Sequence, residues 1–290
     1  MFIQQLVNGI ILGSTYALIA LGYTMVYGII ELINFAHGEI YMCGAFVALV
    51  LVAKLQMPFI IAFPLAMIAA SLLGITIEYL AYRPLRRSSR LAALISAIGA
   101  SIFLQNLALL IAKARPHSFP SPFAPKIYQT SLVTISKLEV IILVISILLM
   151  LGLTFFIRNT KTGKAMRATA QDKDTASLMG ININKIITVT FAIGSALGAA
   201  AGVLVGIYFR TVTPMMGLMP GLKGFVAAVL GGIGSIPGAM LGGLLLGIAE
   251  VMGAAYISSQ YRDAVAFTIL ILVLLFKPSG LVGRTVQEKL

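Results

Sequence analysis

The chain has 290 residues and a formal net charge of +12, with only 10% charged residues against roughly 25% in ordinary soluble domains. Hydrophobic residues make up 59% of it, and 28 glycines lie among long apolar runs, which is typical of packed transmembrane helices. This composition excludes a soluble enzyme, a disordered chain and a coiled coil. We attribute the positive charge to loops between membrane spans, and predict contact with membrane lipid and no nucleic-acid partner.

The first apolar run is not preceded by a basic segment, and no small-residue cleavage site closes it. We therefore expect a retained span rather than a signal peptide. Cys43 is the only cysteine in the sequence, which excludes a disulfide framework or a cysteine metal cluster within one chain. The two histidines, His37 and His117, predict no metal site, since His117 lies in a proline-rich segment.

About eight apolar runs approach the roughly 20 residues that a helix needs to cross the bilayer core. The alternating ten-residue strands of a membrane barrel are absent from the sequence. We therefore predict an all-α polytopic integral membrane protein, with residues 1–290 forming a single transmembrane domain. The predicted spans are residues 6–30, 38–53, 58–81, 91–112, 140–157, 186–209, 225–252 and 264–276.

Basic residues in short loops predict how these spans are oriented. Residues 83–90 contain four arginines, and residues 158–185 contain six lysines and arginines. Both segments are predicted to be cytoplasmic, because cytoplasmic loops are enriched in these residues. The connection of residues 113–138 then lies outside, and its prolines indicate an exposed, irregular segment.

The number of spans conflicts with the C-terminal charges. Eight simple crossings would place Lys277, Arg284 and Lys289 outside, whereas the same rule places them inside. The glycine-rich residues 231–238 interrupt a long apolar stretch, so we predict two short or re-entrant helices between residues 221 and 256. Residues 31–39 form a second predicted break. Paired interruptions early and late in a chain indicate a substrate path between repeats.

Asn34, Phe35, His37 and Gly38 in the first break are our candidates for the substrate pathway. Non-helical backbone at membrane depth is tolerated only inside protein or beside water, which favours the lining of a cavity. The alternative interpretation is that Asn34 caps the next helix and His37 lies at an interface near the membrane surface.

The predicted cytoplasmic segment 158–185 combines charges with small and apolar residues. Met166, Ala170, Leu178 and Ile181 lie near helical spacing, and Gly180 suits a helix end. This pattern favours a short helix that docks in a groove of a partner protein. The alternative is a solvated basic loop.

The sequence contains no P-loop motif, so any energy must come from another subunit or from an ion gradient. An ion-coupled carrier usually has a carboxylate at membrane depth. Among Glu78, Asp263 and Glu250, we expect only Glu250 to be internal. No combination of Ser, His and Asp indicates a hydrolase.

Several strings resemble bacterial branched-chain amino acid ABC importer permeases of the Liv H type. The first, from Tyr16 to Glu39, contains the motif Asn34-Phe35-Ala36-His37-Gly38. The resemblance continues over most of the chain, except the connection of residues 113–138. The further matching strings are residues 81–86, 94–99, 101–106, 227–239 and 278–284.

The resemblance implies an ABC importer permease fold in a bacterial cytoplasmic (inner) membrane, where the C-terminal charges predict a cytoplasmic C-terminus. It implies a homologous second permease subunit, two cytoplasmic ATPase subunits that use the ATP, and an extracytoplasmic substrate-binding protein. This chain would then be a transport subunit, not an enzyme, and would hold no cofactor. The positions that match the ATPase-coupling helix are Arg167, Ala168, Ala170, Asp172, Ala176 and Gly180.

The implied substrates are leucine, isoleucine and valine. Two alternatives remain at this point: a permease of the same superfamily for urea, short amides or simple sugars, and an ion-coupled secondary carrier that depends on Glu250.

Overall fold

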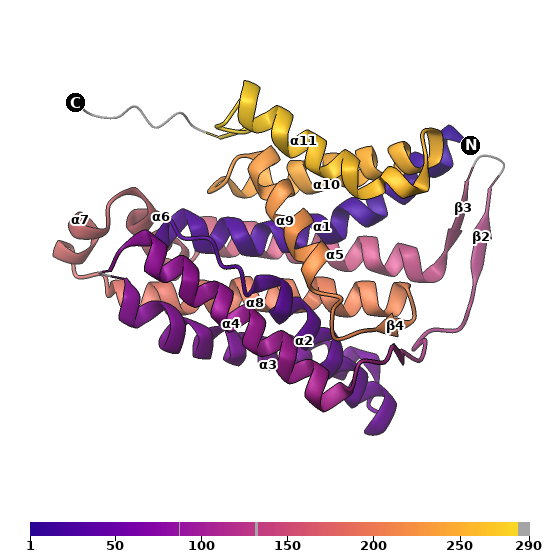
Figure 1. Cartoon of the computed structure of the whole chain (residues 1–290), viewed down its shortest axis with the longest axis horizontal. Helices are drawn as coiled ribbons and strands as arrows, with labels where there is room; N and C mark the ends of the chain where they lie inside the picture. The colour runs from indigo at the N-terminus through magenta and orange to yellow at the C-terminus, as the bar shows by residue number, and fades with distance from the viewer. Residues whose placement is uncertain (87, 131–132, 284–290) are drawn as a thin grey trace.

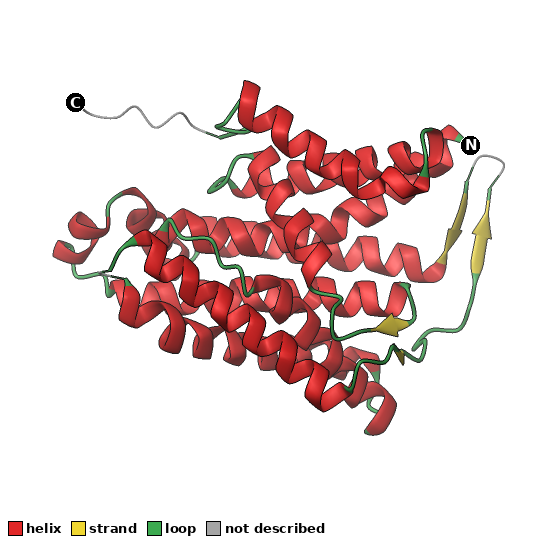
Figure 2. Ribbon diagram, in the orientation of Figure 1, coloured by secondary structure: helices red, strands yellow, loops and turns green. Residues whose placement is uncertain are grey.

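The computed structural model describes residues 1–290 except 87, 131–132 and 284–290, so Arg87, Arg284 and Lys289 lie outside the described residues. The chain is a helical bundle with short strands at one end (Figures 1 and 2). Its first half comprises α1 (Phe2–Ile30), α2 (His37–Leu49) with a π-helical turn (Val50–Lys54), α3 (Phe59–Ile77) with π-helical and 3-10 turns (Glu78–Tyr82, Arg83–Leu85), and α4 (Arg90–Ala112). The second half comprises β1 (His117–Ser118), β2 (Ile127–Gln129), β3 (Thr134–Ser136), α5 (Lys137–Asn159), α6 (Lys161–Gln171), α7 (Lys173–Leu178), α8 (Ile183–Tyr208), β4 (Thr211–Val212), α9 (Leu218–Gly231), α10 (Ile236–Tyr256), a 3-10 turn (Ser259–Tyr261) and α11 (Arg262–Phe276).

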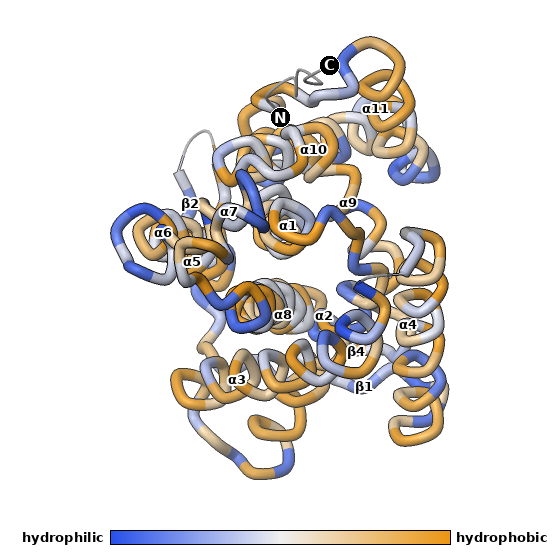
Figure 3. Tube along the Cα trace, turned by 90° about the vertical axis from the view of Figure 1, so that its left-hand side faces the viewer, coloured by the Kyte–Doolittle hydropathy of each residue, from blue (hydrophilic) through white to orange (hydrophobic). Residues whose placement is uncertain are grey.

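The helix α1 forms the centre of the bundle and packs against α8, α9 and α10. Figure 3, seen from the end that carries α6 and α7, shows α1 between α10 and α8, with α4 and α11 at the periphery. A helix that is apolar on all sides belongs in such a core. In contrast, α4 and α11 bury only a small share of their residues and expose many large apolar side chains, as expected for helices that face lipid or another subunit.

The bundle has two ends, which we call the α6–α7 end and the β2–β3 end (Figure 1). The helix α1 begins at the β2–β3 end, where the Gln4 side chain exchanges hydrogen bonds of 3.0 and 2.8 Å with the backbone of Thr134. The strand β2 pairs with β3, and β1 pairs with β4, both antiparallel. The proline-rich connection is therefore non-helical, as predicted, but partly ordered by strand pairing.

Eight helices among the described residues are long and apolar enough to cross a membrane. The prediction of an all-α polytopic protein with about eight apolar spans and broken segments is confirmed. The apolar run of residues 225–252 contains two helices, as predicted for residues 221–256, because α9 ends at Gly231 and α10 begins at Ile236. The break between them is the glycine-rich stretch, where Gly232 and Gly234 adopt φ values of 104° and 91°, a conformation that favours glycine.

This division of one run into two helices changes the number of crossings. The segment after α11 pairs with the end of α9, since the N–H of Leu281 donates to the carbonyl of Leu230 at 2.9 Å. A hypothetical Cβ on Gly28, near the end of α1, would lie 3.4 Å from Gly234. The ends of α1, α9 and α11 therefore lie together at the α6–α7 end, opposite the start of α1.

Two helices, α2 and α9, begin inside the bundle rather than at its ends. His37, the first residue of α2, lies against Gly22, which precedes the end of α1 by eight residues, or about 12 Å of helix. Gly38 in turn contacts Gly217, directly before α9, so closely that a Cβ on either residue would overlap the other backbone. From this meeting point α2 runs toward the β2–β3 end and α9 toward the α6–α7 end (Figure 1).

Candidate functional site

A cavity of about 230 Å³ lies where α2 and α9 begin, with α4 as its third wall. Because both helices start here, the N–H groups of their first turns give this region a partial positive charge. Most of the wall is apolar, which suits a small solute with an aliphatic part. The lining residues are Tyr23, Phe35, Gly38, Glu39, Ile98, Ser101, Ile102, Gln105, Gly217, Leu218, Gly221 and Leu222.

Two of the four predicted pathway residues, Phe35 and Gly38, line this cavity. Asn34 and His37 are each only 1% exposed and lie behind it. The His37 ring packs between Gly22 of α1 and Gly198 of α8, with the Tyr23 ring 4.7 Å away.

The alternative interpretation of Asn34 as a helix cap is wrong in detail. Its Oδ1 accepts the N–H of Ala36 at 3.1 Å and the hydroxyl of Tyr82 at 3.2 Å, whereas α2 has no side-chain cap. Asn34 therefore shapes the turn that enters α2 and ties it to the π-helical turn after α3. His37 is buried inside the bundle, where its ring contacts α1 and α8.

Glu39 is a residue of this cavity that was not among the predicted pathway residues. Its side chain lines the cavity and is 2% exposed, and Oε1 accepts the Ser101 hydroxyl at 3.3 Å. Its Oε2 has no hydrogen-bond partner among the described residues. The signal in the sequence that could have identified Glu39 is a carboxylate at the start of an apolar run.

Glu250 is internal, as expected, at 1% exposure. It accepts hydrogen bonds of 2.9 Å from the Tyr16 hydroxyl and 2.9 Å from the Lys223 ammonium. The Arg262 guanidinium lies 2.5 Å from the same carboxylate, and Lys223 is also 2.6 Å from Asp263. This ion network joins α1, α9, α10 and α11 and satisfies the charges inside the bundle.

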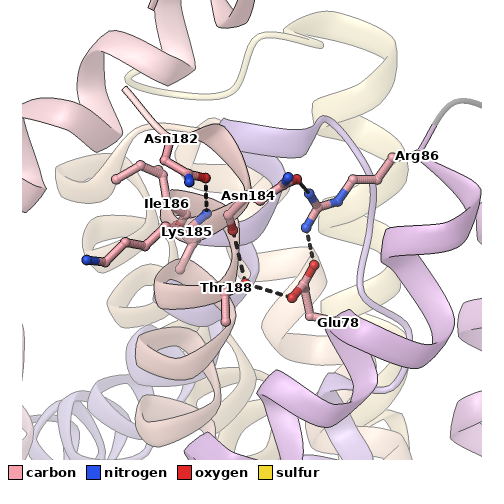
Figure 4. Close-up of polar contacts among 8 residues, drawn as sticks. Glu78, Arg86, Asn182, Asn184, Lys185, Ile186 and Thr188 are labelled. Atoms are coloured by element: carbon pink, nitrogen blue, oxygen red, sulfur yellow. Dashed lines mark hydrogen bonds and ion pairs between the residues drawn. The ribbon is translucent and has the colours of Figure 1, made fainter. Parts of the chain in front are cut away.

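Glu78 contradicts the expectation that only Glu250 is internal, since Glu78 is also 1% exposed. It forms an ion pair with Arg86 and accepts the Thr188 hydroxyl at 2.8 Å. Arg86 also donates to Asn184 at 2.6 Å. Figure 4 shows these groups at the start of α8, where the Asn182 side chain accepts the N–H of Lys185. The network connects the loop after α3 to the first turn of α8.

The predicted coupling segment forms two helices, α6 and α7, instead of one. Asp172 separates them: its Oδ1 accepts the N–H groups of Asp174 and Thr175 at 2.9 and 3.0 Å, as an N-cap of α7. After α7, Gly180 ends the segment at φ 82°, as its sequence position predicts. Of the six predicted coupling residues, Arg167, Ala170, Asp172 and Gly180 are exposed, Ala168 is half-buried and Ala176 is buried.

The helix α6 is firmly attached to the bundle. Met166 is buried at 2% exposure, and α6 packs against α1, α5 and α8. The Arg167 guanidinium donates to the carbonyls of Ile157 and Arg158 at the end of α5. In contrast, Leu178 and Met179 at the end of α7 are 88% and 79% exposed.

Together these features define a polytopic membrane protein with two broken helices that meet at a central cavity and a separate helical segment at one end, the architecture of a transport permease. The profile of the family described as "branched-chain amino acid transport system / permease component" matches residues 5–274. The chain belongs to this family, and the resemblance of the sequence strings is confirmed.

Two relatives match nearly the whole chain. The high-affinity branched-chain amino acid transport system permease protein BraD of Pseudomonas aeruginosa is 52% identical, with 99% of this chain and 98% of the relative covered. The corresponding LivH protein of Escherichia coli is 51% identical, with 99% and 97% covered.

A solved structure, PsaBC from Streptococcus pneumoniae in complex with Fab, has a similar fold. The TM-score is 0.51 at 12% sequence identity, with 94% of this chain and 91% of that chain covered. This similarity concerns the fold alone.

Proposed function

We propose that this chain is the membrane-spanning permease subunit of an ATP-driven importer that moves leucine, isoleucine or valine into the cytoplasm. The observation that carries the proposal is the identity of 52% and 51%, over nearly full length, to two permeases of high-affinity branched-chain amino acid systems. The chain serves as a transport subunit without an ATP site, and two cytoplasmic ATPase subunits hydrolyse the ATP.

The cavity at the start of α2 and α9 is part of the substrate pathway. Phe35 and Gly38 line it, while Asn34 and His37 hold the entry into α2 in place. A homologous second permease subunit completes the path. The exposed apolar side chains of α4 and α11 support this arrangement, because α4 also forms one wall of the cavity.

Residues 158–185 form the segment that couples the permease to an ATPase subunit. Leu178 and Met179 provide exposed apolar side chains for a groove on the partner. Arg167 and Met166 fix α6 to the bundle, so a movement of α7 is transmitted to α1, α5 and α8. The Glu78–Arg86 network passes the same movement to the loop after α3.

The α6–α7 end lies on the cytoplasmic side of a bacterial inner membrane. Arg83, Arg158, Lys161 and Lys164 are among the basic residues at this end, which agrees with the charge bias of cytoplasmic loops. The C-terminus is then cytoplasmic, and the β2–β3 end receives the extracytoplasmic substrate-binding protein.

Vesicle uptake tests the proposal. The assembled complex, with both permeases, the ATPases and the binding protein, is expected to accumulate leucine only with ATP. Uptake by the isolated chain under an ion gradient would overturn the proposal. It would favour an ion-coupled secondary carrier that depends on Glu250. If urea or ribose, and not leucine, competes for uptake by the complex, the complex transports another class of substrate.

Two variants test the coupling segment. Asp172→Arg and Gly180→Pro should each abolish ATP-coupled uptake while the complex still assembles, because each disrupts one end of α7. Asp174→Arg makes the same charge change without removing the cap and is the matched control. Normal uptake by both variants would refute the coupling role.

A further inference from the structure

We propose that Glu39 is the binding group for the ammonium of the amino acid as it crosses the membrane. This inference rests on the proposed function and deepens it, because it assigns one polar contact of the substrate to one side chain of the pathway. The ammonium site lies in the cavity between α2, α4 and α9, apart from the ion network around Glu250.

The burial of Glu39 is the first observation. Its side chain is 2% exposed, and removing a carboxylate from water is costly unless a partner compensates the charge. The Ser101 hydroxyl at 3.3 Å is its hydrogen-bond donor, and Oε2 has no partner among the described residues. Among the residues that the structure describes, the other buried acidic residues are Glu78 and Glu250, and each pairs with an arginine or a lysine.

The cavity provides space for the missing partner. Glu39 lines it together with Gln105 and Ser101, and the remaining wall includes Ile98, Ile102 and Leu222. A solute that fits this lining has a cationic hydrogen-bond donor beside an aliphatic group. A branched-chain amino acid has both, and its ammonium supplies three donors.

The helix starts explain why a zwitterion fits better than a simple cation. The first turns of α2 and α9 meet at Gly38 and Gly217, which both line the cavity. Their partial positive charge favours a carboxylate in the same space and disfavours a cation without one. Glu39 and these helix starts are complementary to the two charges of an amino acid.

Uptake by the complete complex provides the first test. If the wild-type complex fails to import leucine with ATP, the proposed function is refuted before any variant is made.

If the wild type is active, Glu39→Gln should lower the maximal uptake rate by about tenfold or more at saturating binding protein, because a charged hydrogen bond is lost. Gln keeps the size of the side chain and an acceptor for Ser101. Glu139→Gln is the control, since Gln is also suitable in the capping box of α5. Uptake by Glu39→Gln within twofold of wild type would refute the inference alone.

A second measurement does not change Glu39 and so does not depend on the folding of that variant. Cys43 is the only cysteine, so Ser101→Cys in a Cys43→Ser background places a single thiol in the cavity. Leucine should slow labelling of this thiol by a neutral reagent in the assembled complex. Isoamylamine, which keeps the ammonium, should protect less than leucine because it lacks the carboxylate that the helix starts favour. It should still protect more than isocaproate, whose carboxylate would lie beside the unpaired Glu39 without an ammonium to compensate it. Equal protection by the acid and the amine would overturn the ammonium assignment, as would labelling that leucine leaves unchanged.

Discussion

At the scale of one residue, Asp172 determines how α6 and α7, the proposed coupling segment, are folded. Its carboxylate caps α7 through the N–H groups of Asp174 and Thr175. We predict that Asp172→Ala increases hydrogen exchange in α7 severalfold and weakens ATP-coupled uptake, whereas Asp172→Asn preserves both, because Asn is an equally good N-cap. Hydrogen exchange by mass spectrometry checks this. Equal effects of Ala and Asn would show that the charge, not the cap, is required.

The same contact predicts a pH dependence. The Thr175 hydroxyl donates to Asp172 at 2.6 Å and, with two backbone N–H groups, lowers the pKa of this carboxyl below its usual range. A lowered pKa stabilises the folded state above the unfolded pKa, and this contribution is lost as the pH falls through the folded pKa. The backbone amides of α7 should therefore be protected against hydrogen exchange at neutral pH. They should lose this protection only in strong acid. Thr175→Val should move this loss of protection to higher pH.

At the scale of elements, glycines determine the packing of α1 against α10. A Cβ on Gly247 would overlap the backbone of Gly13, and one on Gly243 would overlap Ala17. We predict that Gly247→Val destabilises the protein by about 1–3 kcal/mol, because it forces the two helices apart. Gly152→Ala on α5 meets no atom within 4 Å, and should be neutral or stabilising by about 0.5–1 kcal/mol. Thermal unfolding in detergent checks both, and equal stability of the two variants would contradict the packing argument.

The broken helices follow from local chemistry that the sequence already contains. Gly232 and Gly234 terminate α9, and Ser235 caps α10 through the N–H of Gly238. The break before α2 depends on Asn34, whose side chain bonds backbone two residues ahead. The predicted positions of both breaks were correct for this reason. The contact between Gly38 and Gly217 joins parts of the chain far apart in sequence, and no local pattern predicted it.

At the scale of the whole molecule, the ion network connects four helices. Breaking a buried ion pair leaves an uncompensated charge and costs about 3–5 kcal/mol. We predict that Lys223→Met and Glu250→Gln each lower the unfolding temperature, and that the double variant loses less than the sum of the two. The coupling should be roughly 0.5–3 kcal/mol, as for residues in one network. Additive losses would mean that the two side chains stabilise the bundle independently.

The orientation of the bundle in the membrane is a property of the whole molecule, and we predict that the α6–α7 end faces the cytoplasm. In a Cys43→Ser background, Ile257→Cys and Leu178→Cys place single exposed thiols at the β2–β3 end and the α6–α7 end respectively. An impermeant thiol reagent added outside intact cells stripped of any outer envelope should label Ile257→Cys and leave Leu178→Cys unlabelled. Opening the membrane should expose the second thiol. The reverse pattern would invert the proposed topology.

The sequence by itself determined the membrane class, most of the apolar spans, the two breaks and the glycine that ends α7. These features depend on run length, on local glycine and asparagine chemistry and on loop charge, all of which are local in sequence. The tertiary structure decided which carboxylates are buried and which remain without a partner. Glu39 and Glu250 look alike in sequence, as single acids within apolar runs. They differ because Lys223 and Arg262 reach Glu250, whereas Glu39 lines a cavity with Ser101 as its hydrogen-bond donor, and such contacts form only when distant helices pack together.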